Sequence, residues 1–148
     1  MFFDGFTREV DKRKTKAAVE KALERYRMFT LQVSLDKQPS ITANYSLTST
    51  SNHLPSSSTE RAAIKNVQYE RDRIEYLEWI SSAVNRLSEI ERTIIYRRYL
   101  RKYEQFDYEI YNELNMSERS YYRLKAKLFI NLAIALKIEV YKEEVHDP

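Results

Sequence analysis

Apolar residues recur at helical spacing along most of the chain, and this pattern predicts an all-α protein. The first such stretch covers residues 7–35. It carries a thin apolar stripe, crowded by lysines and arginines, that consists of Val10, Ala17, Leu23 and Tyr26. A thin stripe on a long helix favours either contact with a second subunit or a simple cover helix, and the sequence leaves both open.

A second long helix is predicted over residues 59–85. Its apolar positions are Ala63, Val67, Ile74, Leu77, Ile80, Ala83 and Val84, and Ser58 or Thr59 is the expected N-cap. Trp79, the one tryptophan, is expected in the core or in an interface. Between the two helices, residues 36–59 are rich in Ser, Thr, Asn and Pro, which predicts a linker with Ile41, Tyr45 and Leu47 as its apolar contacts.

The last third of the chain predicts three shorter pieces. Ser88 followed by Glu91 is a capping-box pattern, and it opens a helix whose core positions are Ile90, Ile94, Ile95 and Leu100. After a break at residues 101–105, a short helix begins near Asp107, with Phe106, Ile110 and Leu114 on one side. A final helix runs from Ser117 to about Lys137, and the polar tail from Tyr141 is expected to fray.

These elements suggest three parts. Residues 1–35 would be an N-terminal helix that serves as an arm or for oligomerisation. Residues 36–59 would be the polar linker. Residues 60–148 would be a helical DNA-binding domain with a helix-turn-helix at about 106–137.

Composition narrows the function classes. One Gly and three Pro in 148 residues agree with long helices. With no Cys and only His53 and His146, no cofactor or metal site is expected, and without a phosphate loop or a nucleophile–base pair no enzyme is expected. The N-terminus has no signal-peptide pattern and no apolar run is long enough to span a bilayer, so the expected location is the cytoplasm. A net charge of +3 permits a polyanionic partner.

The turn at residues 115–117 has the residue types that a helix-turn-helix needs. Asn115 tolerates unusual backbone angles, Met116 can plug the core, and Ser117 can cap the following helix. On a wheel of ~100° per residue, the inner side of that helix carries Tyr121, Leu124, Leu128 and Leu132.

The opposite, outer face is basic and hydroxyl-rich, and its expected base-reading residues are Arg119, Ser120, Tyr122, Arg123 and Lys127. Ala126 allows close approach to a groove, and arginine can donate two hydrogen bonds to guanine. The expected DNA-backbone contacts are Ser117 and an upstream basic cluster of Arg92, Arg97, Arg98, Arg101 and Lys102. Basic residues on one helix face are also commonly only solvated, so the prediction depends on the combination.

Two stretches together resemble known proteins. Residues 87–100 (LSEIERTIIYRRYL), followed by residues 107–128, are similar to the C-terminal DNA-binding region of sigma factors, with Leu87, Glu91, Arg92 and residues 97–99 matching its opening. The stretch MSERSYYRLK at 116–125, with the basic first helix and PSITANYSL at 39–47, resembles the ArpU family of phage and prophage regulators. The resemblance implies control of late phage genes for packaging and lysis. The chain lacks a segment like the part of sigma factors that binds the −10 element and core polymerase.

The sequence therefore predicts a sequence-specific transcriptional regulator that binds double-stranded DNA. Two alternatives stay open: a protein that recognises DNA for the initiation of phage packaging, like a small terminase, and a helical adaptor that binds RNA polymerase without reading bases. A homodimer is consistent with the first reading, because one short reading helix covers few base pairs.

Overall fold

We describe the computed structural model over residues 8–42 and 60–143, with side chains from residue 66 onward in the second stretch. In this part of the chain, five α-helices and two short helical segments follow one another: α1 Lys12–Gln32, η2 Leu35–Lys37, α2 Glu60–Asn85, α3 Glu89–Ile95, η3 Tyr96–Leu100, α4 Asp107–Glu113 and α5 Glu118–Leu136. The all-α class predicted from the sequence is confirmed.

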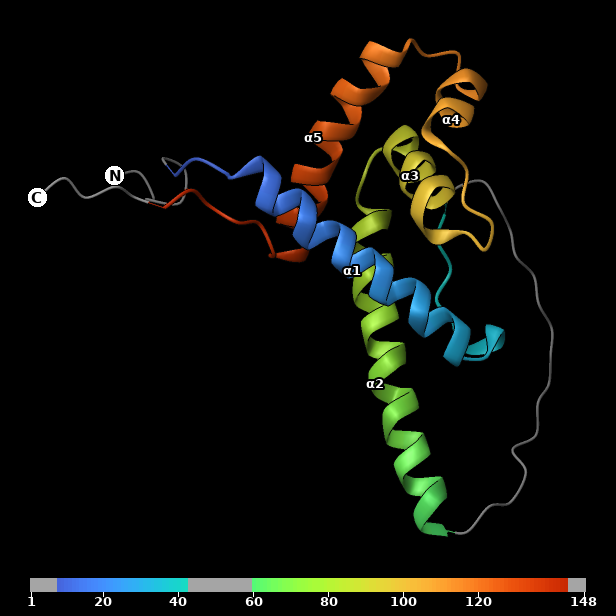
Figure 1. The fold of residues 1–148 in the computed structure, drawn as a ribbon. Helices are drawn as coiled ribbons and strands as arrows, with labels where there is room; N and C mark the ends of the chain where they lie inside the picture. The colour runs from blue at the N-terminus through green and yellow to red at the C-terminus, as the bar shows by residue number, and fades with distance from the viewer. Residues whose placement is uncertain (1–7, 43–59, 144–148) are drawn as a thin grey trace, which may run out of the picture.

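α1 lies across the middle of the molecule and packs against α5, α2 and η3 (Figure 1). Its buried stripe is Thr15, Val19, Leu23 and Tyr26. Ala17, placed in the stripe from sequence, is exposed. The stripe is therefore filled from within the chain, while Met28 and Leu31 of α1 remain exposed.

The start of α1 is held by the segment that follows α5. Asp11 caps the helix by accepting a hydrogen bond from the Lys14 amide at 3.0 Å. The Asp11 amide donates to the Val140 carbonyl at 2.8 Å, and the Lys142 amide donates to the Glu9 carbonyl at 2.8 Å. The prediction that the tail frays from Tyr141 is therefore wrong for residues 141–142. The polar composition of this short stretch gives no sign that its backbone pairs with the residues before α1.

The end of α1 also comes earlier than predicted, at Gln32. Val33 takes an extended conformation and is buried. The Gln38 side-chain amide donates to the carbonyls of Thr30 and Val33 at 2.9 and 2.8 Å, which satisfies groups that a helix end leaves open. The first residues of the predicted linker are thus ordered, and Ile41 packs against the core. Tyr45, Leu47 and the proposed cap at Ser58 or Thr59 lie outside the described residues.

Besides Ala17, three residues expected on the core side are exposed, and so is Trp79, for which the sequence predicts a place in the core or in an interface. Trp79 is 41% exposed, because Leu77 and Ile80 occupy the inner side of α2 and Trp79 is rotated ~160° from Leu77. Val67 is 55% exposed and belongs to the first turns of α2, where residues 66–69 are all exposed. Phe106 precedes α4 as its N-cap residue and is outside the helix repeat. Ile90 is 38% exposed, and nothing in the structure explains it.

The junction between α4 and α5 forms as predicted from its residue types. Asn115 has a φ of 54°, in the left-handed region. The Met116 amide donates to the Tyr111 carbonyl at 2.8 Å, and the Met116 side chain packs against the core. Ser117 caps α5, and its hydroxyl accepts a hydrogen bond from the Ser120 amide at 3.1 Å. The chain thus passes from the end of α4 at Glu113 to the start of α5 at Glu118 through four residues.

The left-handed backbone at Asn115 yields a stability prediction. Replacing Asn115 by Ala should lower the free energy of unfolding by about 1 kcal/mol, because a Cβ without a compensating side chain is strained there. Asn115→Gly should be neutral or slightly stabilising. Asn112→Ala, in α4 with ordinary helical angles, is the control. Urea denaturation of the three variants measures the effect, and equal stabilities for the two Ala variants would contradict this account.

Candidate nucleic-acid interface

The outer face of α5 presents its basic residues to solvent. All five predicted base-reading residues are exposed: Arg119, Ser120, Tyr122, Arg123 and Lys127. Ala126, also exposed, lies among them. Within the described residues, the side chains of Arg119 and Arg123 form no hydrogen bond or ion pair. Two full positive charges on this face are therefore not paired with an acid of the described residues.

The inner face of α5 is buried as predicted. Tyr121, Leu128 and Leu132 are fully buried, and Leu124 is half-buried. Tyr121 also contacts the ring of Tyr111 in α4, with centroids 5.6 Å apart. Burial of the inner side fixes which side of α5 can meet a ligand.

Asp107, the first residue of α4, ties α4 to α5. Its carboxylate accepts a hydrogen bond from the Tyr121 hydroxyl at 2.6 Å and two from the Lys125 ammonium at 2.9 and 3.1 Å. Arg98 approaches the same carboxylate at 3.6 Å. Tyr121 and Lys125 are one helical turn apart on α5, so a single carboxylate fixes both the rotation and the tilt of α5 against α4.

Lys125 is a buried cation that the sequence pattern did not reveal. It is 7% exposed, and its ammonium lies 5.3 Å from the centre of the Tyr99 ring and 5.9 Å from that of Phe129. The signal that could have found it is its place on the wheel, about 40° from Tyr121 and between the apolar positions Leu132 and Phe129. A lysine on an inner face requires a buried acid nearby.

The pKa values of this cluster follow from burial and pairing. Burial on its own would raise the pKa of Asp107, but the hydrogen bonds from Tyr121 and Lys125 and the charges of Lys125 and Arg98 bring it below the ordinary value. Burial lowers the pKa of Lys125, against the opposing effect of Asp107. Burial and the hydrogen bond to Asp107 raise the pKa of Tyr121. Asp107 is therefore held ionised, and Tyr121 is held as a donor.

A second contact ties α3 to α5. Ser88 and Glu91 form the predicted capping box. The Glu91 carboxylate also accepts a hydrogen bond from the Asn131 side chain of α5 at 3.2 Å. Burial would raise the pKa of Glu91, but the hydrogen bonds from Ser88 and Asn131 outweigh it and lower the pKa.

The upstream basic residues do not form one free cationic patch. Arg97 pairs with Glu113 at 2.7 Å, and Arg98 pairs with Glu104 at 3.4 Å as well as with Asp107. Arg101 donates to the Tyr103 carbonyl at 2.7 Å and to Gln105 at 3.3 Å. These three arginines organise the loop between η3 and α4.

Arg92 and Lys102 differ from each other. Arg92 donates to the carbonyls of Leu87 and Asn85 at 2.8 and 3.4 Å, so it stabilises the end of α2. Lys102 is exposed, with its ammonium 5.6 Å from the centre of the Tyr103 ring. Of the predicted backbone-contacting cations, only Lys102 keeps an exposed side chain, while Ser117 is exposed but serves as the cap of α5.

The described residues contain neither a candidate metal site nor a helix that could span a membrane. No group of three or more His, Cys, Asp or Glu side chains in them lies close enough together to hold a metal ion. None of their helices is long and apolar enough to cross a membrane.

The chain is similar in sequence to a phage-related protein. It is 29% identical over 135 residues to an "Uncharacterized phage-related protein Lin1259/Lin1739" of Listeria innocua. The aligned stretch covers 90% of this chain and 94% of that protein. No protein-family model matches the chain. No solved structure matches it. The chain is thus similar over nearly its whole length to a phage-related protein.

Removal of the Asp107 charge should destabilise the fold. Asp107→Asn should lower the free energy of unfolding by about 2–3 kcal/mol, because it leaves the Lys125 ammonium buried without its counter-charge. Glu109→Gln, two residues further along α4, is the control. Denaturant unfolding measures both. The double variant Asp107→Asn/Lys125→Met should be more stable than Asp107→Asn alone, and a double variant at least as unstable would show that the pair is not coupled.

The same pair gives the fold an acid dependence. A carboxylate whose pKa is lowered on folding stabilises the protein above its ordinary pKa of 3.8, and this contribution is lost as the pH falls through the lowered value. The stability of the wild type should therefore fall between about pH 5 and pH 2, and that of Asp107→Asn should fall less steeply. Urea titrations across this range test the point; parallel curves would show that Asp107 carries no special stabilisation.

Proposed function

We propose that this protein is a phage or prophage regulator that binds double-stranded DNA through the outer face of α5. The observation that carries the proposal is the difference among its arginines. Arg97 and Arg98 are paired with acids of the chain, whereas Arg119 and Arg123 are exposed and have no side-chain partner among the described residues. Two adjacent cations on one face that have no acid of their own chain as a partner provide a site for an anionic ligand.

The rest of α5 is consistent with base reading. Ser120 and Tyr122 can donate or accept hydrogen bonds, and the small side chain of Ala126 permits close approach to a groove. Residues 117–120, at the N-terminus of α5, are exposed. Helix N-termini bind phosphate favourably. Lys127 adds a cation on the same face. The buried tie through Asp107 keeps this face in a fixed orientation relative to α4.

The phage context is supported by the similarity to the phage-related Listeria protein. The resemblance of residues 87–128 to the DNA-binding region of sigma factors, and of residues 116–125 to the ArpU family, adds the more specific role: control of late genes for packaging and lysis. In this proposal, the chain acts in the cytoplasm at host or phage DNA, and it needs no cofactor and catalyses no reaction.

A polymerase-binding adaptor is the second candidate, and one observation favours it. Phe106 and Tyr108 are 64% and 54% exposed, and their rings are stacked at 5.8 Å at the start of α4. Exposed stacked aromatic rings are typical of protein contacts. Phe106 and Tyr108 lie at the start of α4 and not on the outer face of α5. A protein contact there is therefore compatible with DNA binding by α5.

A selection from a random duplex library at two salt concentrations tests the proposal, followed by affinity measurements on the enriched duplex. Arg123→Ala and Arg119→Ala should each weaken specific binding by about 5- to 150-fold, the value of a bidentate base contact. Arg25→Ala, an exposed arginine on α1, is the control of equal charge change and should stay within about twofold.

The outcomes separate the candidates. An enriched motif with a steep salt dependence supports a sequence reader. Salt-sensitive binding without a motif would indicate a packaging or architectural role instead. Absence of binding at low salt would overturn the DNA proposal, and the adaptor would then lead.

A further inference from the structure

The first described part of α2 stands apart from the rest of the molecule. Figure 1 shows α2 extending well beyond its crossing with α1. Residues 66–69 are all exposed, so this turn of the helix is not covered by any described part of the chain. A helix of 26 residues is about 39 Å long. Helices gain most of their stability in water from packing, so an uncovered end with apolar residues indicates a missing partner.

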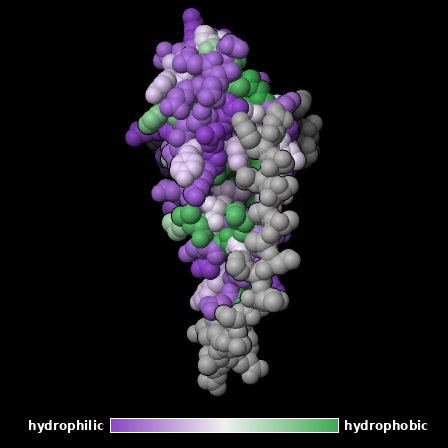
Figure 2. Space-filling model, turned by 90° about the vertical axis from the view of Figure 1, so that its right-hand side faces the viewer, coloured by the Kyte–Doolittle hydropathy of each residue, from purple (hydrophilic) through white to green (hydrophobic). Residues whose placement is uncertain are grey.

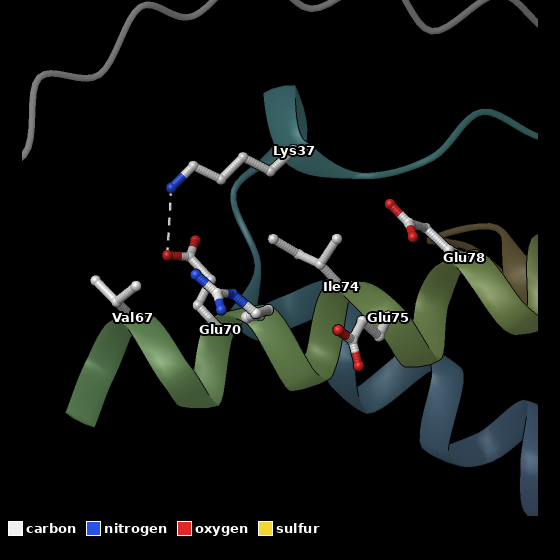
Figure 3. Close-up of a pocket in the computed structure, with 7 residues that line it drawn as sticks. Lys37, Val67, Glu70, Ile74, Glu75 and Glu78 are labelled. Atoms are coloured by element: carbon white, nitrogen blue, oxygen red, sulfur yellow. Dashed lines mark hydrogen bonds and ion pairs between the residues drawn. The ribbon is translucent and has the colours of Figure 1, made fainter. Parts of the chain in front are cut away.

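One face of this projecting part is partly apolar. An open hollow of about 410 Å³ lies along it, lined by Lys37, Val67, Glu70, Arg71, Ile74, Glu75 and Glu78. In Figure 3, Val67, Glu70 and Ile74 lie along the side of α2 that looks toward Lys37, which pairs with Glu70 at 3.2 Å. Val67 is 55% exposed, and Leu35, in η2 beside this hollow, is 62% exposed. Figure 2 shows apolar residues gathered at mid-height on the side where α1 ends, below a mostly hydrophilic upper part.

We propose that a second copy of this chain binds along this face, with its α2 antiparallel to the first. The residue spacing supports this arrangement. If the two-fold axis passes between Glu70 and Arg71, each Val67 lies opposite Ile74 of the other copy. Each Glu70 then lies opposite Arg71 of the other copy. Because of the two-fold axis, this one register forms the Val67–Ile74 contact twice and the Glu70–Arg71 pair twice.

The charges favour a second copy over other partners. Glu70, Glu75 and Glu78 outnumber Lys37 and Arg71 in the hollow, so a nucleic acid would be repelled. A purely basic partner would satisfy the acids but leave Arg71 opposed by like charge. A parallel pair would place Glu70 against Glu70 and Arg71 against Arg71. Only the antiparallel copy pairs opposite charges at both central positions.

The dimer surface lies away from the proposed reading face. In Figure 1, the projecting end of α2 and the start of α5 are at opposite ends of the molecule. A two-fold pair joined through α2 would therefore leave both α5 faces uncovered. The inference does not depend on DNA binding, because it rests on α2 and η2 alone.

Sedimentation equilibrium of the full chain tests the proposal by exchange of charges. Glu70→Arg should weaken the dimer roughly tenfold, because it faces Arg71 of the other copy. The triple variant Lys37→Glu/Glu70→Arg/Arg71→Glu should restore it, because the pair with Arg71 of the other copy and the pair with Lys37 of the same chain are then both exchanged. Asp72→Arg changes the charge equally on another side of α2 and should leave the dimer unchanged.

Cysteine cross-linking tests the register, since the chain has no Cys of its own. A mixture of Val67→Cys and Ile74→Cys chains should form disulfide-linked heterodimers, at least about tenfold faster than either variant cross-links with itself. Equal self-linking by Val67→Cys would overturn the antiparallel register.

Two results would overturn the proposal as a whole. The first is a wild type that stays monomeric up to millimolar concentration, which would leave this face to residues 43–59 or to a different protein. The second is a dimer that Glu70→Arg and Asp72→Arg weaken equally, which would place the interface elsewhere. Each result can be obtained whether or not the chain binds DNA, so the two proposals can fail separately.

Discussion

The arrangement of the C-terminal helices depends on one half-buried carboxylate. Asp107 begins α4 and accepts hydrogen bonds from Tyr121 and Lys125, one turn apart on α5. A buried ammonium without that carboxylate would be costly, so the two helices are held in the one orientation that pairs them. This contact and the apolar inner stripe together determine which side of α5 faces outward.

The arginines between α3 and the middle of α5 fall into two groups with different physical roles. Arg92, Arg97, Arg98 and Arg101 bond to carbonyls and acids of their own chain and shape the segment from α3 to α4. Arg119 and Arg123 are exposed without such partners in the described residues. Sequence alone does not separate these groups, because the acids that pair with the first group come from other elements. The proposed function rests on the second group alone.

Periodicity was sufficient where an element buries a simple stripe. It predicted α5, its cap at Ser117 and the burial of Tyr121, and the turn followed from the backbone tolerance of Asn115. It failed where a long-range contact decides the outcome. The pairing of residues 9–11 with 140–142, the burial of Lys125 and the closure of the α1 end by Gln38 all join positions that no local pattern connects.

The same limit explains the errors on α2. Its helical repeat continues through Val67, and periodicity predicts such a repeat to be core, but Ile74 packs against the core whereas Val67 does not. In the folded chain the core ends at the crossing with α1, so part of the repeat is left uncovered. For the candidate interface, the exposure of all five base-reading residues agrees with the wheel, whereas the upstream cluster does not behave as one surface.

An NMR titration would test the central claim most directly. Backbone amide and arginine side-chain signals would be followed while a duplex is added at low salt. The account predicts that the largest shifts fall on residues 117–127, with the Arg119 and Arg123 side chains among them, and that residues 66–76 are unaffected. Shifts centred on Arg97 and Arg98 with α5 silent, or no shifts at all, would contradict it.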